Sequence, residues 1–193
     1  MTLVAGIDEA GRGPIVGPLI IAGILINEED SAKLKTIGTK DSKLLTHKKR
    51  IALAKQILKI IKNQKIILVQ PNEIDNAVQG HDGLNLNWLE ARKTAEIINH
   101  LRPDKAIIDC PSPNIKAYSN YLKKFINNQN IEIIVEHKAE KYEPVAAASI
   151  IAKVAREDEV EKIEKKISTS TLNYSENPGC PIKSKSRKKS RKN

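Results

Sequence analysis

Acidic side chains stand at the ends of two predicted strands, where they could share one site. Asp8 and Glu9 come directly after the apolar run 2–7, and Asp109 ends the run 105–109. In α/β folds such residues gather at the carboxyl edge of the sheet. Neighbouring carboxylates repel each other and require cations, and oxygen ligands favour Mg²⁺ or Mn²⁺. The pattern therefore has the ingredients of two-metal phosphodiester hydrolysis, although an acidic pair at a strand end is also typical of a simple turn.

A short glycine-containing segment, Gly11-Arg12-Gly13, follows the first acidic pair. Because glycine has no Cβ, the backbone here can approach a ligand closely, and its N–H and C=O groups can contact sugar or phosphate. The segment is too short to identify a phosphate site by itself. A turn is the other interpretation.

The elements that must position these residues can be read from apolar patterning. Strands are predicted at 2–7, 17–26, 64–70, 105–109 and 131–136, and helices at 47–62, 84–101, 115–127 and 144–167. Apolar runs rich in β-branched residues are the basis of the strands, and helical spacing of apolar residues and helical propensity are the basis of the helices. Two strands come first and then alternate with helices, which predicts an α/β fold with a mixed central sheet flanked by helices.

Charge is concentrated at the C-terminus. The chain of 193 residues has a formal net charge of +10, yet residues 183–193 hold seven Lys or Arg and no acid. This segment has no apolar residue with which to join a core, so we expect a disordered basic tail. Such a tail suits sequence-independent attraction to a polyanion such as nucleic acid. A solubilising or localisation tail is the alternative.

Other features exclude whole classes of protein. Cys110 and Cys180 lie far apart with no CxxC pair, so neither a zinc site nor a disulfide framework is indicated. Acidic residues occur too early for a signal peptide, and no apolar run has the length of a membrane span. We expect a soluble cytoplasmic protein that does not enter a membrane.

Several motifs together resemble the type 2 RNase H family. They are GIDEAGRGPIVGPLIIAG (6–23), KDSKLLT (40–46), AIID (106–109) and HKAEKYEPVAAASIIAKVARE (137–157). The resemblance covers roughly residues 3–178, with the motifs in the family's order. It implies an RNase H-like fold with a catalytic domain over residues 1–178, followed by the basic tail 179–193.

The resemblance also implies a set of metal ligands. Asp8, Glu9 and Asp109 match three of the family's four metal-binding carboxylates, with Asp8 bridging two divalent ions, Mn²⁺ or Mg²⁺. The fourth is usually Asp, and Glu140 stands in its place after His-Lys-Ala. Glu143 is the rival candidate. Glu140 is preferred because the residues before it and the proline after it keep the expected offsets.

Substrate contacts follow from the same resemblance. The backbone of Gly11, Arg12 and Gly13 matches the motif that recognises the ribose 2′-hydroxyl, the group that separates RNA from DNA. Lys43 would bind a phosphate, or else is a solvated surface lysine. Tyr174 resembles the tyrosine that stacks near the RNA-to-DNA junction, in a loosely matching segment.

Two further polar residues lie in the last motif. His137 is expected to support Glu140, and a purely structural histidine is the alternative. Ser149 is expected to be a helix-packing residue, because no acyl-transfer arrangement surrounds it.

The activity implied is cleavage of the RNA strand of RNA:DNA hybrids, including 5′ of single ribonucleotides in duplex DNA. Products would carry 5′-phosphate and 3′-hydroxyl ends, and the role would be removal of ribonucleotides and RNA primers. We expect a monomer. One alternative is a resolvase or transposase core of the same broad fold. The other is a non-catalytic protein that binds RNA:DNA hybrids.

Overall fold

The computed structural model describes residues 1–13, 16–39, 45–80 and 83–175, with side chains described as far as residue 168. The chain divides into a compact unit, Met1–Val160, and a second unit that begins at Glu161. The sheet and every site residue discussed in detail below belong to the first unit. Lys43 and the predicted tail, 179–193, lie outside the described residues.

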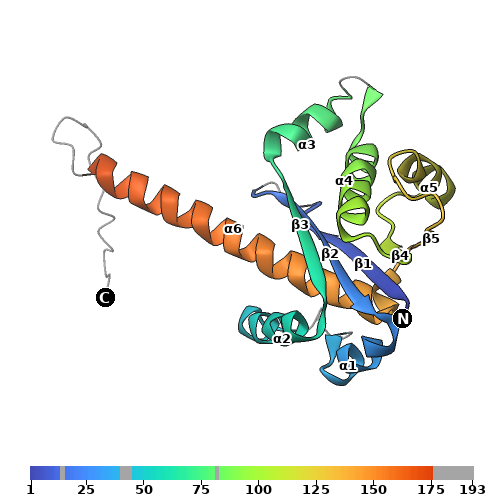
Figure 1. Ribbon diagram of the computed structural model, residues 1–193. Coiled ribbons are helices and arrows are strands. Elements are labelled where there is room, and N and C mark those ends of the chain that lie inside the picture. The colour runs from blue at the N-terminus through green and yellow to red at the C-terminus, as the bar shows by residue number, and fades with distance from the viewer. Residues whose placement is uncertain (14–15, 40–44, 81–82, 176–193) are drawn as a thin grey trace, which may run out of the picture. The chain divides into compact units, whose positions relative to one another are not determined.

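A five-stranded mixed sheet forms the centre of the first unit (Figure 1). The strands are β1 (Leu3–Ala10), β2 (Leu19–Asn27), β3 (Asn63–Val69), β4 (Lys105–Asp109) and β5 (Glu132–Glu136). Their order is β3-β2-β1-β4-β5. β2 is antiparallel to both β1 and β3, whereas β4 is parallel to β1 and to β5.

The described residues also form six α-helices. They are α1 (Ser31–Thr36), α2 (His47–Ile60), α3 (Pro71–Val78), α4 (Leu86–Leu101), α5 (Ile115–Lys123) and α6 (Glu143–Ser175). Short 3-10 turns lie at Glu28–Asp30 and Ala139–Lys141. Thr46, Asn85 and Asn114 begin α2, α4 and α5 by accepting a hydrogen bond from a backbone N–H of the first turn. These caps satisfy donors that have no partner within the helix.

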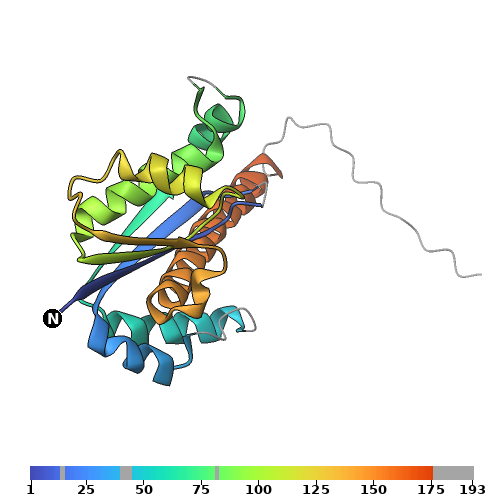
Figure 2. The same ribbon diagram turned by 90° about the vertical axis from the view of Figure 1, so that its right-hand side faces the viewer.

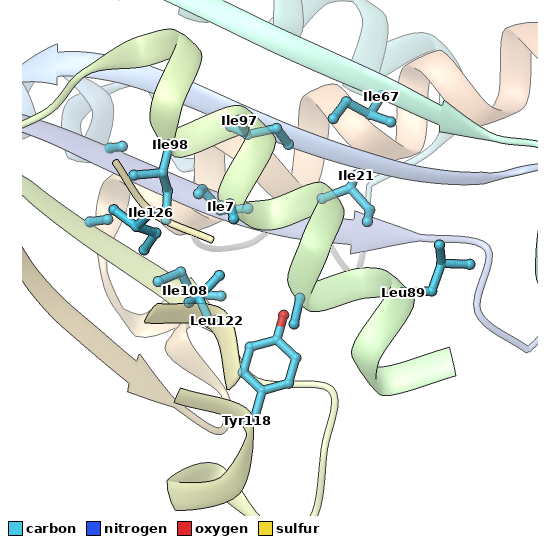
Figure 3. Packing of buried hydrophobic residues seen from close by; sticks show 14 of the residues in the cluster. Ile7, Ile21, Ile67, Leu89, Ile97, Ile98, Ile108, Tyr118, Leu122 and Ile126 are labelled. Carbon is cyan, nitrogen blue, oxygen red and sulfur yellow. The ribbon is translucent and has the colours of Figure 1, made fainter. Parts of the chain in front are cut away.

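The two faces of the sheet build two aliphatic cores. Side chains alternate along each strand, so Ala5 and Ile7 of β1 face one core while Val4 faces the other. The first core lies under α3, α4 and α5, and Figure 3 shows its packing around Ile7, Leu122 and Tyr118. The second lies under α1, α2 and the N-terminal part of α6. Figure 2 shows the two helical layers on opposite sides of the sheet.

Two glycines in the strands allow helices to pack unusually close. A Cβ at Gly6 would lie 2.5 Å from the Val145 amide nitrogen and nearer still to the Pro144 carbonyl. The start of α6 therefore rests directly on the β1 backbone. At Gly23 the space is filled instead by the Ile97 side chain of α4.

The mixed α/β architecture predicted from the sequence is confirmed. The expected strands and helices all occur, but the prediction that Asp8 and Glu9 follow the first strand is wrong. β1 continues to Ala10 because it pairs with β2 as far as Ala10 and Ile20. Neither α1 nor α3 was predicted; Pro71, expected only to stop a strand, is also the first residue of α3. None of the described helices has the length and apolar character needed to cross a membrane.

Candidate active site

Parallel pairing of β1 with β4 brings the predicted acidic residues together. Ile7 pairs with Ile108, so Asp8 and Asp109, one residue further on, lie beside each other at the same edge of the sheet. Asp109 pairs in turn with Glu136 of β5. The chain that leaves β5 then carries Glu140 toward the same edge.

Asp8 is the buried centre of this group, with a side chain only 5% exposed. Burial raises the pKa of its carboxyl to about 7, and the negative charges of Asp109 and Glu140 act in the same direction. Hydrogen bonds with the Ser149 side chain and with the Glu9 backbone N–H, at 2.8 Å, oppose the shift. The structure thus places Asp8 within electrostatic reach of two other predicted ligands.

Asp109 is tied to the segment that carries Glu140. Its Oδ1 accepts a hydrogen bond from the Ala139 N–H at 2.9 Å. Ala139 begins the 3-10 turn Ala139–Lys141, after Lys138 in a left-handed conformation at φ +58°. This bond fixes the turn, and Glu140 with it, against the end of β4.

Glu9 is the second member of the acidic pair on β1. Burial raises the pKa of its carboxyl well above the usual value, and the charges of Asp8, Glu90 and Asp109 raise it further. The Arg12 guanidinium acts in the opposite direction. Glu90, a buried carboxylate of α4, was not singled out from the sequence, because helical spacing marks its position only as part of the buried face.

The turn after β1 packs against α6. Gly11 has φ +102°, in the left-handed region that favours glycine. A Cβ at this position would lie 2.5 Å from Arg156 Nε. Arg156 also donates a hydrogen bond from Nη2 to the Val16 carbonyl at 2.8 Å. Arg156 therefore contacts the chain after β1 at two places, Gly11 and Val16.

Ser149 has a contact beyond the packing role expected from the sequence. It is 1% exposed and forms a hydrogen bond with Asp8. Its Oγ also accepts a hydrogen bond from Lys153 Nζ, one helical turn later, at 2.9 Å. The single hydroxyl proton is therefore free to be donated to Asp8. A serine within an alanine-rich helical run next to the acidic motif is the sequence signal that could have identified it.

The remaining predicted residues have less definite positions. Glu143 is the first residue of α6, and Tyr174 lies near the C-terminal end of the same helix, where no side chain is described. His137 Nδ1 lies 3.1 Å from the Cys110 carbonyl oxygen, which places it beside the residue that follows Asp109. Lys43 is outside the described residues.

The donor set fits a divalent cation in its chemistry. Asp8, Glu9, Asp109 and Glu140 offer carboxylate oxygens, the ligands that Mg²⁺ and Mn²⁺ prefer. Asp8 is buried and Glu9 is partly buried, and the raised pKa of each carboxyl means that a cation would stabilise its charged form. In the described part of the chain, however, no three acidic, histidine or cysteine side chains already converge on a common point.

Comparison with known proteins identifies the family of this chain. The family model for ribonuclease HII matches residues 5–192. A ribonuclease HII of Methanococcus maripaludis is 41% identical over 181 residues, which cover 91% of this chain and 74% of the relative.

Solved structures agree as well. The ribonuclease H2 of Pyrococcus horikoshii superposes with a TM-score of 0.77 at 40% identity, covering 93% of this chain and 81% of that one. The ribonuclease HII of Archaeoglobus fulgidus, solved in a complex with PCNA, gives 0.76 at 37% identity, covering 91% and 82%. The chain therefore belongs to the ribonuclease HII family, endoribonucleases that act on RNA:DNA hybrids.

Proposed function

We propose that this chain cuts the RNA strand of RNA:DNA hybrids, and also cuts 5′ of a single ribonucleotide within duplex DNA, using two divalent cations. The observation that carries the proposal is the buried carboxylate group around Asp8 at the edge shared by β1 and β4. Asp8 is under the electrostatic influence of both Asp109 and Glu140. The products would carry 5′-phosphate and 3′-hydroxyl ends.

Asp8, Glu9, Asp109 and Glu140 would hold the cations. Divalent ions bound there would neutralise the clustered charge, activate water and stabilise the leaving oxygen. Asp8 is suited to the central position because it is the most enclosed of the group and is oriented by Ser149 and the Glu9 N–H. The link from Ala139 to Asp109 supports Glu140, rather than Glu143, as the fourth ligand.

The turn Gly11-Arg12-Gly13 would recognise the ribose. It lies directly after β1, exposed at Arg12 and Gly13, and a Cβ at Gly13 would meet nothing within 4 Å. The backbone is therefore open to a substrate next to the carboxylates, and a 2′-hydroxyl can both donate to and accept from peptide groups. Lys43 as a phosphate ligand and Tyr174 at the junction are carried over from the family resemblance.

Cleavage assays test this proposal directly. The protein is incubated with Mg²⁺ or Mn²⁺ and either a long RNA:DNA hybrid or a DNA duplex containing one ribonucleotide. The expected result is cleavage of both, with a nick 5′ of the single ribonucleotide. Failure to cut either substrate overturns the proposal.

Variants separate catalysis from binding. Asp8→Asn should abolish turnover and retain binding, since it removes a ligand charge without removing volume. Glu140→Ala should do the same, whereas Glu143→Ala should retain turnover; the reverse result would make Glu143 the fourth ligand. A wild type that binds hybrid but turns over no faster than Asp8→Asn would be a non-catalytic hybrid-binding protein.

A further inference from the structure

The Arg12 side chain is directed toward acceptors of the protein itself. Its Nη1 donates a hydrogen bond to the Pro111 carbonyl and its Nη2 to Asn87 Oδ1, both at 2.5 Å. Nη1 also lies 3.3 Å from Glu90 Oε2. Asn87 and Glu90 belong to α4, and Pro111 belongs to the loop after β4. One guanidinium thus joins three parts of the chain that are far apart in sequence.

Glu90 is an unusual member of the buried face of α4. Its side chain is 2% exposed, and in the described part of the chain neither carboxylate oxygen has a partner with hydrogen-bond geometry. Burial raises the pKa of its carboxyl to about 7, even though Arg12 lowers it. A buried carboxylate is destabilising compared with an apolar residue of similar volume, so its presence calls for a role other than packing.

The location of these contacts connects them to the active site. Arg12 comes three residues after Glu9, and Pro111 comes two residues after Asp109. The Arg12 contacts therefore join the ends of the two strands that carry the candidate metal ligands. They also hold the Arg12 side chain in place. Because Arg12 lies between Gly11 and Gly13, this limits how the backbone of the turn can rotate.

We propose that Glu90 and Asn87 are positioning residues that hold the Arg12 guanidinium inward, so that the peptide groups of Gly11–Gly13 face the ribose. Arg12 then acts as an anchor for the turn and not as a phosphate ligand. This inference rests on the proposed function, because it assigns the turn to recognition of the 2′-hydroxyl. It explains why a motif that works through its backbone contains an arginine.

Binding measurements on matched duplexes test the proposal. Each variant is made in the Asp8→Asn background to block turnover, and fluorescence anisotropy gives Kd for a DNA duplex with one ribonucleotide and for the all-DNA duplex. The Kd for the all-DNA duplex divided by the Kd for the ribonucleotide duplex measures the preference for a 2′-hydroxyl. Glu90→Leu should reduce this ratio by about tenfold, because a small displacement of a recognition group is sufficient for such a loss. Glu90→Gln, which keeps an acceptor oxygen, should retain most of it.

The control is Glu96→Leu, an exposed position on the same helix, which should keep the wild-type ratio. If Glu90→Leu does not fold, Asn87→Ala tests the same anchor from a partly exposed position. A structural defect would weaken binding to both duplexes equally, whereas a positioning defect weakens only the preference for ribose. An unchanged ratio in Glu90→Leu, or in Asn87→Ala where that variant is used, overturns the proposal.

Arg12→Met distinguishes an anchor from a phosphate ligand. Loss of a phosphate contact would weaken both duplexes and make the salt dependence of binding shallower, and that result would also overturn the proposal. Loss of an anchor lowers the ratio, and Arg12→Met/Glu90→Leu should lower it no further than Arg12→Met alone. Wild-type cleavage is measured separately, so absence of activity on any ribonucleotide substrate would refute the proposed function instead.

Discussion

Replacement of Gly6 by alanine should separate α6 from the sheet. The added Cβ would lie 2.5 Å from the Val145 amide nitrogen and closer to the Pro144 carbonyl. These are backbone atoms at the start of a helix, so they can move only if the helix moves. The change therefore acts on the packing of α6 against β1, and not on a single flexible side chain.

The size of the effect follows from this geometry. Overpacking a well-packed core typically costs about 1–3 kcal/mol, and alanine regains about 0.5–1 kcal/mol of backbone entropy. Because the obstruction at Gly6 is main chain, we expect a cost at the upper end of this range and, after the entropy gain, a net loss of about 2 kcal/mol. For a chain of this length that lowers Tm by about 4–8 °C. Activity should fall as well, because α6 carries the Ser149 hydroxyl that bonds to Asp8.

Thermal unfolding followed by circular dichroism, with metal chelated, measures the effect. Gly23→Ala is a second overpacked position, since its Cβ would overlap Ile97 Cγ2 and an isoleucine in a helix has one strongly preferred rotamer, so its Tm should also fall. Gly13→Ala should leave Tm near the wild-type value, because nothing lies within 4 Å. A Tm for Gly6→Ala as high as that of Gly13→Ala would refute the reasoning.

Three more changes test other contacts. Glu157→Gln should lower the free energy of unfolding by about 1 kcal/mol, because Glu157 pairs with two basic residues of α2. Denaturant unfolding measures this, with Asp158→Asn, a change at an exposed neighbour, as the control. Ser149→Ala should raise the Mn²⁺ concentration needed for half-maximal binding by about tenfold, as a hydrogen bond to the charged Asp8 is lost, and calorimetry checks this. Without metal, the free energy of unfolding should fall as pH rises from 5 to 8, and it should fall less steeply in Glu90→Gln than in the wild type.

The sign of the pH effect follows from the direction of the pKa shift. Burial raises the folded-state pKa of Glu90 to about 7, above its usual value of 4.5. The folded state therefore binds more protons than the unfolded state between these values, and stability is lost as pH rises through the window. The contribution of Glu90 is on the order of 3 kcal/mol. A Glu90→Gln profile parallel to the wild type would contradict this assignment.

For the other two changes, the contradicting results are equally direct. Equal stability of Glu157→Gln and Asp158→Asn would mean that the contacts between α2 and α6 contribute nothing measurable. Unchanged Mn²⁺ affinity in Ser149→Ala would mean that the hydroxyl does not orient Asp8 for cation binding.

Local sequence patterns were sufficient for most of the fold. Apolar runs rich in β-branched residues predicted the five strands, and helical spacing of apolar residues together with helical propensity predicted four of the helices. The same approach missed α1 and α3, which are short, and ended β1 too early. Asp8 and Glu9 are polar, so the pattern stops before them, although pairing with β2 continues to Ala10.

By itself the sequence determined the chemistry: carboxylates at strand ends, a glycine turn and ordered motifs that indicate a hybrid-cutting nuclease. Tertiary structure decided which groups meet. Parallel pairing of β1 with β4 places Asp8 beside Asp109, and packing of α6 on Gly6 accompanies the bond from Ser149 to Asp8. The contact between Arg12 and Glu90 spans 78 positions, and no local pattern encodes it. Such contacts depend on how distant elements pack, because burial and electrostatic interactions are set by distance in the folded protein and not by separation along the sequence.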